Sequence, residues 1–298
     1  MKYKIQSSTA AEKLTNVPKN VITDGKSQVK PLAKVIQTKA KLNSPILIAG
    51  FPGAGMVGAI STSYIIEKLH MHQIACVESD FIIPGVIYVG GKLRHPFRLY
   101  ANEEGSVCVL VCESPIMIHG IHSVLDTVMK WAISAKSTEV IVLDGIAVQG
   151  MFEGKREPMI LSSDGQVVDK AKLLHDEEYN NKKYNNKHSL FNTAFIGGTA
   201  GGLLSSCLSN GIACKALLIA ATSGIPDPEG AAILIESVAK VADKELLKID
   251  TRELREQGAD LKRRMEQIMR SVQDQQHQQG QAQQQGQNTV GEGVIMYG

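Results

Sequence analysis

The sequence has little net charge, which removes two broad classes of partner. Its 298 residues include 32 Lys and Arg against 30 Asp and Glu, giving a formal net charge of +2. A chain so close to neutral has no bulk electrostatic basis for binding nucleic acid or a membrane surface. We therefore expect neither a nucleic acid nor a membrane as partner.

The sequence also lacks a long apolar run. The longest apolar stretch, residues 45–60, is interrupted by Pro52 and several glycines. It is shorter than the roughly 20 residues that a membrane-spanning helix needs. The first residues are polar and contain no apolar segment of the kind found in signal peptides. These features predict a cytoplasmic protein.

Cysteines are few, and their number is odd, which does not favour a disulfide framework. All of them lie in apolar segments, as expected for buried thiols in a reducing compartment. They are Cys76, Cys108, Cys112, Cys207 and Cys214.

Motifs for catalysis and metal binding are missing as well. The close histidine pairs, His70 with His72 and His119 with His122, have no Cys or carboxylate partners at zinc-binding spacing. No nucleophile elbow or Ser-His-Asp order can be identified. We therefore predict no metal, no cofactor and no catalytic residues, and expect that the protein is not an enzyme.

The chain does contain apolar strand-like runs that alternate with helical patterns. Such alternation predicts an α/β fold, with a mainly parallel sheet covered by helices on both faces. The run Glu139–Leu143 is predicted to be a buried strand, and the Asp144-Gly145 pair that follows is expected to end it. The other predicted strands are residues 45–49, 73–78, 86–89, 97–101, 107–112 and 214–221. The predicted helices are residues 56–69, 119–134, 197–210, 254–272 and one from Asp227 or Pro228 to about Leu247.

Composition changes along the chain predict its organisation. Residues 1–34 form a polar, lysine-rich N-terminal arm, which we expect to be frayed and solvated. The α/β core domain then covers residues 35–250, and a C-terminal helix covers 251–272. Within the core, residues 175–188 are charged and rich in Asn, which is typical of an exposed loop.

The C-terminal helix carries an apolar stripe with two interpretations. Leu254, Leu261 and Ile268 are seven residues apart, and Gly258 and Met265 follow the first two by four residues. This spacing is the a/d register of a coiled coil, interrupted by Gly258. The stripe can pack on its own domain, which we favour, or against another subunit.

A glycine-rich segment after the first buried strand also has two interpretations. Gly53, Gly55 and Gly58 form a GxGxxG pattern between a strand and a helix, and Glu78 lies 20 residues beyond Gly58. This arrangement resembles a dinucleotide-binding fingerprint. Because Pro52 precedes the first glycine of the triplet, we favour a tight turn with close helix–strand packing. A second glycine cluster, residues 197–202, lacks the Lys-Ser/Thr of a P-loop, and there too we expect close helix packing.

The last residues differ in kind from those that precede them. Residues 273–293 are rich in Gln and Gly and should form a flexible, disordered linker. Residues 294–298 are apolar and aromatic and end in Met296, Tyr297 and Gly298. A cluster of this kind beyond a linker has no core of its own to join. We therefore expect it to dock on a partner.

Three segments resemble the proteasome assembly chaperone 2 family. They are residues 45–58 (PILIAGFPGAGMVG), residues 196–224 with their glycine-rich helix and strand, and residues 226–241 (PDPEGAAILIESVAKV). With the helix at 254–272, the resemblance covers roughly residues 35–272. The most specific part of the resemblance is the Pro-Asp-Pro element, followed after two further residues by Ala-Ala. The ending is similar to the hydrophobic-Tyr-x tail of archaeal members.

This resemblance implies a fold, a partner and a function. The fold is a three-layer α/β/α sandwich like that of purine nucleoside phosphorylases. The partner is the proteasome core particle, whose α-ring pockets receive the tail, here Met296, Tyr297 and Gly298. The function is that of an assembly chaperone or activator-like factor, and we expect a homo-oligomer that presents several tails. The alternative is a nucleotide- or nucleoside-binding enzyme, such as an ATP-grasp-like ligase, that uses the loop Gly50–Gly58.

Overall fold

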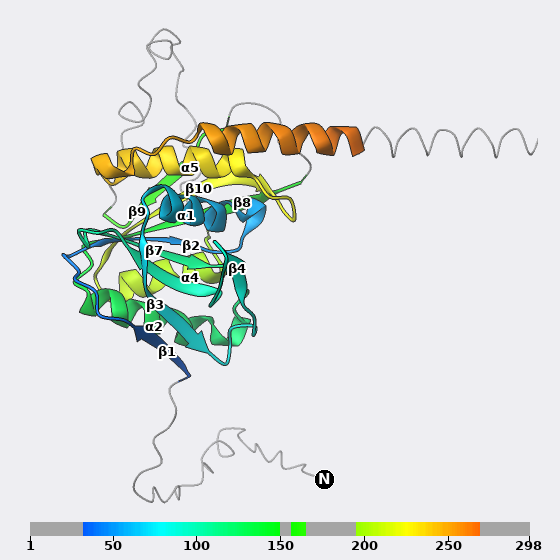
Figure 1. Ribbon diagram of the computed structural model, residues 1–298. Coiled ribbons are helices and arrows are strands. Elements are labelled where there is room, and N and C mark those ends of the chain that lie inside the picture. The colour runs from blue at the N-terminus through cyan, green and yellow to red at the C-terminus, as the bar shows by residue number, and fades with distance from the viewer. Residues whose placement is uncertain (1–31, 150–155, 165–194, 269–298) are drawn as a thin grey trace, which may run out of the picture. The chain divides into compact units, whose positions relative to one another are not determined.

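A mixed eight-stranded sheet lies at the centre of the computed structural model (Figure 1). The structure describes residues 32–149, 156–164 and 195–268. The predicted N-terminal arm, the loop 175–188, the linker and the tail all lie outside or almost outside these ranges. In spatial order the strands are β1 (Ala33–Gln37), β3 (His72–Ser79), β6 (Phe97–Ala101), β7 (Val107–Cys112), β2 (Ile46–Gly50), β8 (Glu139–Val148), β10 (Ala213–Thr222) and β9 (Met159–Ser162).

The central strands of the sheet are parallel and its margins are antiparallel. β7, β2, β8 and β10 pair in parallel, whereas β1, β6 and β9 run in the opposite direction to their neighbours. β3 has the same direction as the central four strands, so the prediction of a mainly parallel sheet is confirmed. A small hairpin of β4 (Ile87–Val89) and β5 (Lys92–Arg94) lies between β3 and β6 in the chain.

Helices cover both faces of the sheet and complete three layers. α1 (Val57–Lys68) and α5 (Pro228–Val241) pack on one face, and α2 (Ile121–Ser134) and α4 (Gly198–Ser209) pack on the other (Figure 1). All residues of β2 and β7 are buried, which explains their continuous apolar sequences. The five cysteines are free and buried, as predicted. No helix among the described residues is long and apolar enough to cross a membrane.

The C-terminal helix, described over residues 252–268, lies beside α1 and α5 (Figure 1). Its Leu254 is only 3% exposed, and Arg255 pairs with Glu236 of α5 at 2.9 Å. A Cβ atom on Gly258 would lie 3.2 Å from the backbone nitrogen of Glu229. The glycine that interrupts the stripe therefore allows a close approach to the start of α5. Packing on the chain's own domain is confirmed for this first part of the stripe, whereas Ile268 is 57% exposed.

Two predicted boundaries are wrong. β8 does not end at Leu143 but continues to Val148, because it pairs with β10 over its whole length. α5 ends at Val241, short of the predicted Leu247, and a single 3-10 turn follows at Glu245–Leu247. Asp243 has a φ of 48°, a backbone conformation that cannot continue an α-helix. The predicted start of α5 is confirmed, since the Asp227 side chain caps it by accepting a hydrogen bond from the Gly230 amide.

Candidate functional site

The carboxyl ends of β2, β8 and β10 meet at one edge of the sheet, which is where open α/β sheets bind ligands. After β2, the chain runs through α1 to β3, beyond β6 and β7. After β7, it runs through α2 to β8, on the other side of β2. The connections therefore diverge beside β2, and the loop Gly50–Gly58 lies at this switch point.

Backbone packing within the protein accounts for two glycines of this loop region. A Cβ atom on Gly50 would lie 2.1 Å from the carbonyl oxygen of Gly58. A Cβ atom on Gly58 would lie 2.3 Å from the carbonyl oxygen of Leu143. The start of α1 therefore rests directly on the backbones of β2 and β8, with no room for a side chain.

The other two glycines of the motif join the loop to β8 and α5. A Cβ atom on Gly53 would lie 2.1 Å from Oδ1 of Asp144. Gly55 has a φ of 65°, which favours glycine, and its carbonyl accepts a hydrogen bond of 2.9 Å from the Asp227 amide. This geometry supports the interpretation of Gly53, Gly55 and Gly58 as a structural turn.

Glu78, the acid that completes the fingerprint in the sequence, does not lie beside the loop. β3 is separated from β2 by β6 and β7, so Glu78 lies on the third strand from the loop. With strands about 4.8 Å apart, that separation is about 14 Å. Glu78 instead pairs with Lys34 of β1 at 3.0 Å. The dinucleotide fingerprint suggested by the spacing is therefore not assembled in the fold.

Asp144 is a titratable group at this edge that the sequence pattern did not single out as functional. Its carboxylate lies against Gly53, and its Oδ1 accepts a hydrogen bond of 2.8 Å from the Gly145 amide. Burial raises the pKa of Asp144 to about 6, although the Gly145 hydrogen bond acts in the opposite direction. The group therefore changes charge near neutral pH.

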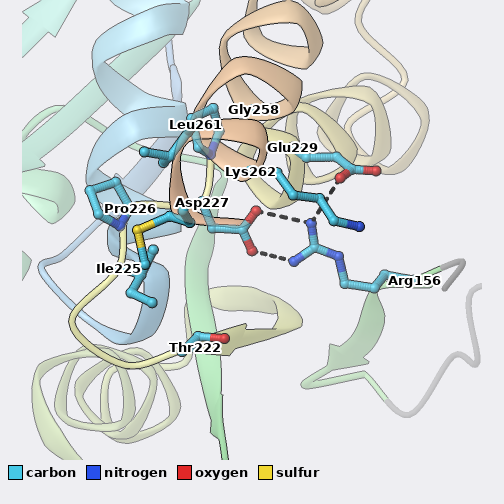
Figure 2. Close-up of a pocket in the computed structure, with 11 residues that line it drawn as sticks. Arg156, Thr222, Ile225, Pro226, Asp227, Glu229, Gly258, Leu261 and Lys262 are labelled. Carbon is cyan, nitrogen blue, oxygen red and sulfur yellow. Dashed lines mark hydrogen bonds and ion pairs between the residues drawn. The ribbon is translucent and has the colours of Figure 1, made fainter. Parts of the chain in front are cut away.

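A small pocket of about 90 Å³ lies between the segment before α5 and the C-terminal helix (Figure 2). It is smaller than the 300–1,000 Å³ that is typical of small-molecule sites. Its lining residues are Arg156, Thr222, Ile225, Pro226, Asp227, Pro228, Glu229, Gly258, Leu261, Lys262 and Met265.

An ion-pair cluster occupies one wall of this pocket (Figure 2). The guanidinium of Arg156 donates to both carboxylate oxygens of Asp227, and it lies 3.7 Å from Glu229. Arg156 also donates to the Ala220 carbonyl of β10 at 3.2 Å, and Asp227 caps α5. The side chains of Arg156 and Asp227 are largely buried. The cluster therefore joins the segment before β9 to β10 and α5, and its charges compensate one another.

In the second glycine cluster, the predicted close helix packing is found at Gly202. A Cβ atom on Gly201 would lie 1.9 Å from the Ile196 carbonyl oxygen, and one on Gly202 would lie 2.7 Å from a methyl group of Leu125 in α2. Gly202 therefore allows α4 to approach α2 closely, and Gly201 leaves room for the segment that leads into α4.

Exposed apolar side chains lie elsewhere among the described residues. The predicted docking residues Met296, Tyr297 and Gly298 are outside the described residues, and their role stays a prediction. Among the described residues, large apolar side chains are exposed on and beside the β4–β5 hairpin, including Val86, Tyr88 at 72% and Leu93. Sequence periodicity did not identify this apolar hairpin surface.

Comparison with known proteins places these features in a family. The model of the PAC2 family matches residues 47–269. An uncharacterised protein of Methanocaldococcus jannaschii is 31% identical over 209 residues, which cover 70% of this chain and 79% of that protein. A protein of unknown function from Thermoplasma acidophilum is 30% identical, with a TM-score of 0.60 over 80% of this chain and 91% of that one.

Two solved structures from Pyrococcus furiosus share the fold at lower identity. PbaA, described as an archaeal homolog of proteasome-assembly chaperone, has a TM-score of 0.61 at 21% identity, and the match covers 87% of this chain and 100% of PbaA. PbaB, described as an archaeal proteasome activator, has a TM-score of 0.64 at 18% identity, and the match covers 82% of this chain and 100% of PbaB. With the family match across most of the core, these findings show that the chain belongs to the PAC2 family.

Proposed function

We propose that this protein is a cytoplasmic, proteasome-binding assembly chaperone or activator-like factor. Its tail, ending in Met296, Tyr297 and Gly298, would dock into α-ring pockets of the proteasome core particle. The observation that carries the proposal is the PAC2 family match over residues 47–269. The descriptions of PbaA and PbaB, which share the fold, connect such proteins to the proteasome. The loop Gly50–Gly58 has the Asp144 carboxylate against Gly53 and, among the described residues, no acid on the neighbouring strand at the fingerprint spacing, which favours this function over a nucleotide-dependent enzyme.

The energy available to one tail argues for several tails acting together. Burial of the Met296 and Tyr297 side chains contributes roughly 1.5–3 kcal/mol for each of the two. A charge-assisted hydrogen bond from a partner lysine to the terminal carboxylate adds about 1.5–3 kcal/mol. The gross total of about 5–9 kcal/mol is offset by the cost of association, so one tail should bind at about millimolar level. Linked tails raise the avidity by about 10²–10⁴.

The C-terminal helix offers a surface for the self-association that linked tails need. Leu254 and Gly258 pack on the chain's own domain, but Leu261 and Met265 are only half-buried. Ile268, one heptad beyond Leu261, is 57% exposed. We propose that this second part of the stripe contacts other copies of the chain and brings their tails together.

The proposal is tested by capture of the core particle from a lysate of the protein's own source. The full chain should retain the core particle, and deletion of Met296–Gly298 should abolish retention. The matched control deletes Gln283–Gln285, which shortens the Gln/Gly tract by the same number of residues and should leave retention intact. Equal retention by the full chain and the tail deletion would show that docking does not use the tail.

Two further assays separate the roles within this function. An activator raises peptide hydrolysis by mature core particles, whereas an assembly chaperone raises the yield of core particles from free subunits. The enzyme alternative is tested by thermal unfolding with ATP, NAD and nucleosides. We expect no shift of the midpoint with any of them, because Glu78 lies three strands from the glycine loop and the Asp144 carboxylate beside Gly53 would repel a phosphate group.

A further inference from the structure

Three side chains with metal-binding atoms converge at the β3–β6 margin of the sheet, far from the glycine loop. Cys76 and Glu78 are two residues apart on β3, so they point to the same face. The antiparallel register pairs Cys76 with Arg98 of β6. Continued by two residues, that register brings the segment just before β6, which contains His95, next to Glu78. The fold thus joins residues that are up to 19 positions apart in the chain.

The distances are short enough for one ion to be shared. The thiol sulfur of Cys76, a carboxylate oxygen of Glu78 and a ring nitrogen of His95 all lie within 4.8 Å of one another. With bonds of about 2.0–2.3 Å to a tetrahedral zinc ion, ligand atoms lie roughly 3.5 Å apart. Rotation of the exposed His95 side chain can bring its ring nitrogen from within 4.8 Å of the other two ligand atoms to the shorter separation that zinc requires.

The three groups are available to bind an ion. Among the described residues, neither the Cys76 thiol nor the His95 imidazole makes a hydrogen bond or ion pair with another side chain. Glu78 uses one oxygen on Lys34, in a pair whose side chains are 50% and 38% exposed. An ion pair that is exposed to this degree contributes little stability and is easily exchanged for a metal ion.

The surrounding groups hold this arrangement in place. The buried guanidinium of Arg98, a residue that is 2% exposed, donates to the backbone carbonyl of His95 and pairs with Glu113. The backbone that carries His95 is therefore held to β6 and, through Arg98, to the residue that follows β7. Cys76 itself is 7% exposed, so its sulfur lies at the edge of the protein interior and not in either apolar core cluster.

We propose that Cys76, Glu78 and His95 form a binding site for a divalent cation of the zinc class. A thiolate and an imidazole select Zn²⁺ over Mg²⁺ or Ca²⁺, which prefer oxygen ligands. The thiolate and the carboxylate together balance the charge of the ion. Three protein ligands leave a fourth position for water or for a side chain of a partner. The site goes beyond proteasome binding, and its ion would join β3 to the segment that leads into β6.

Cobalt(II) provides the direct test, because a cobalt–thiolate bond has a strong ultraviolet absorption. The full chain, without a histidine tag and freed of metal, is titrated with Co²⁺. The wild type should develop the thiolate–cobalt band, and Zn²⁺ should remove it by displacement. Cys76→Ser should lack the band, and His95→Gln and Glu78→Gln should bind at least about tenfold more weakly.

Matched variants distinguish this site from chance binding. His72→Gln removes an exposed histidine at the other end of β3, and Cys214→Ser removes a thiol outside the cluster; both should titrate like the wild type. Absence of the band in the wild type, or its persistence in Cys76→Ser, would overturn the proposal. If Cys76→Ser does not fold, by circular dichroism, the exposed His95→Gln variant decides, and an unchanged cobalt affinity in that variant would also overturn it.

Discussion

The loop Gly50–Gly58 and the second part of the C-terminal helix offer an instructive comparison. The loop has the sequence pattern of a ligand site, but its glycines allow close contacts with the backbone of Leu143 and the carboxylate of Asp144. The helix has an imperfect apolar stripe, and the structure leaves its end at Ile268 exposed. Glycines that resemble a binding motif here serve packing, whereas an exposed apolar residue, Ile268, lies at the end of the helix stripe.

The largest effect is expected where the loop is tightest. In Gly58→Ala the new methyl group would lie 2.3 Å from the Leu143 carbonyl oxygen, so α1 or β8 must move. We expect the free energy of unfolding to fall by about 3 kcal/mol or more, measured by urea denaturation. Gly85→Ala is the control, since a Cβ atom there would have nothing within 4 Å, and it should change stability little. A Gly58→Ala variant as stable as the wild type would mean that the loop has room to spare.

The Arg156–Asp227 pair should come next. Asp227→Ala leaves the largely buried Arg156 guanidinium without its bidentate partner and removes the cap of α5. Loss of one partner of such a buried pair costs about 3–5 kcal/mol. Because Glu229 remains 3.7 Å from Arg156 and partly compensates its charge, we expect the free energy of unfolding to fall by an amount at the lower end of that range. Glu229→Ala, which removes the more exposed acid, should cost at most about 1 kcal/mol. Equal losses in the two variants would show that the Asp227 pair is not the main connection.

A smaller, pH-dependent effect is expected at Asp144. Its pKa is about 6 in the folded protein and 3.8 in the reference state, so the fold favours the protonated form. Asp144 therefore lowers stability as pH rises from about 4 to 6 and has a constant cost above pH 6. Asp144→Asn can keep an acceptor for the Gly145 amide, and at pH 7.5 it should be more stable than the wild type by about 1–3 kcal/mol.

The measurement is the difference in unfolding free energy between Asp144→Asn and the wild type at pH 4 and at pH 7.5. The difference should be near zero at the lower pH and should appear at the higher one. The same difference at both values would contradict the assigned titration of Asp144.

Local patterns predicted most of the fold because they report burial directly. The continuous apolar runs of β2 and β7 and the amphipathic face of α2 gave the correct elements and the correct layers. The Asp144-Gly145 pair was expected to end the strand, but β10 continues to pair with β8 beyond it. Gly145 serves a different purpose, since a Cβ atom there would lie 2.1 Å from the Ala54 carbonyl oxygen.

The site depends on contacts that sequence spacing does not encode. Arg156 and Asp227 are 71 residues apart and meet only because the segment before β9 lies beside the end of β10. Glu78 lies at the fingerprint spacing from the loop, but the strand order places it three strands away. The same strand order brings His95 to Cys76, which local motif searches miss. Sequence spacing predicts which residues of one helix or strand share a face. Which residues of distant segments meet depends on the order of the strands in the sheet, which spacing does not encode.

Docking by the tail is tested most directly by comparing two tyrosine variants in binding to the purified core particle. Tyr297 belongs to the proposed docking tail, and Tyr88 is a 72% exposed residue of the β4–β5 hairpin. Surface plasmon resonance on the immobilised core particle should show that Tyr297→Ala binds at least about tenfold more weakly than the wild type, since each lost tail contact is multiplied over linked tails. Tyr88→Ala should bind like the wild type. A full loss in Tyr88→Ala with unchanged binding by Tyr297→Ala would contradict the account and move the docking surface to the hairpin.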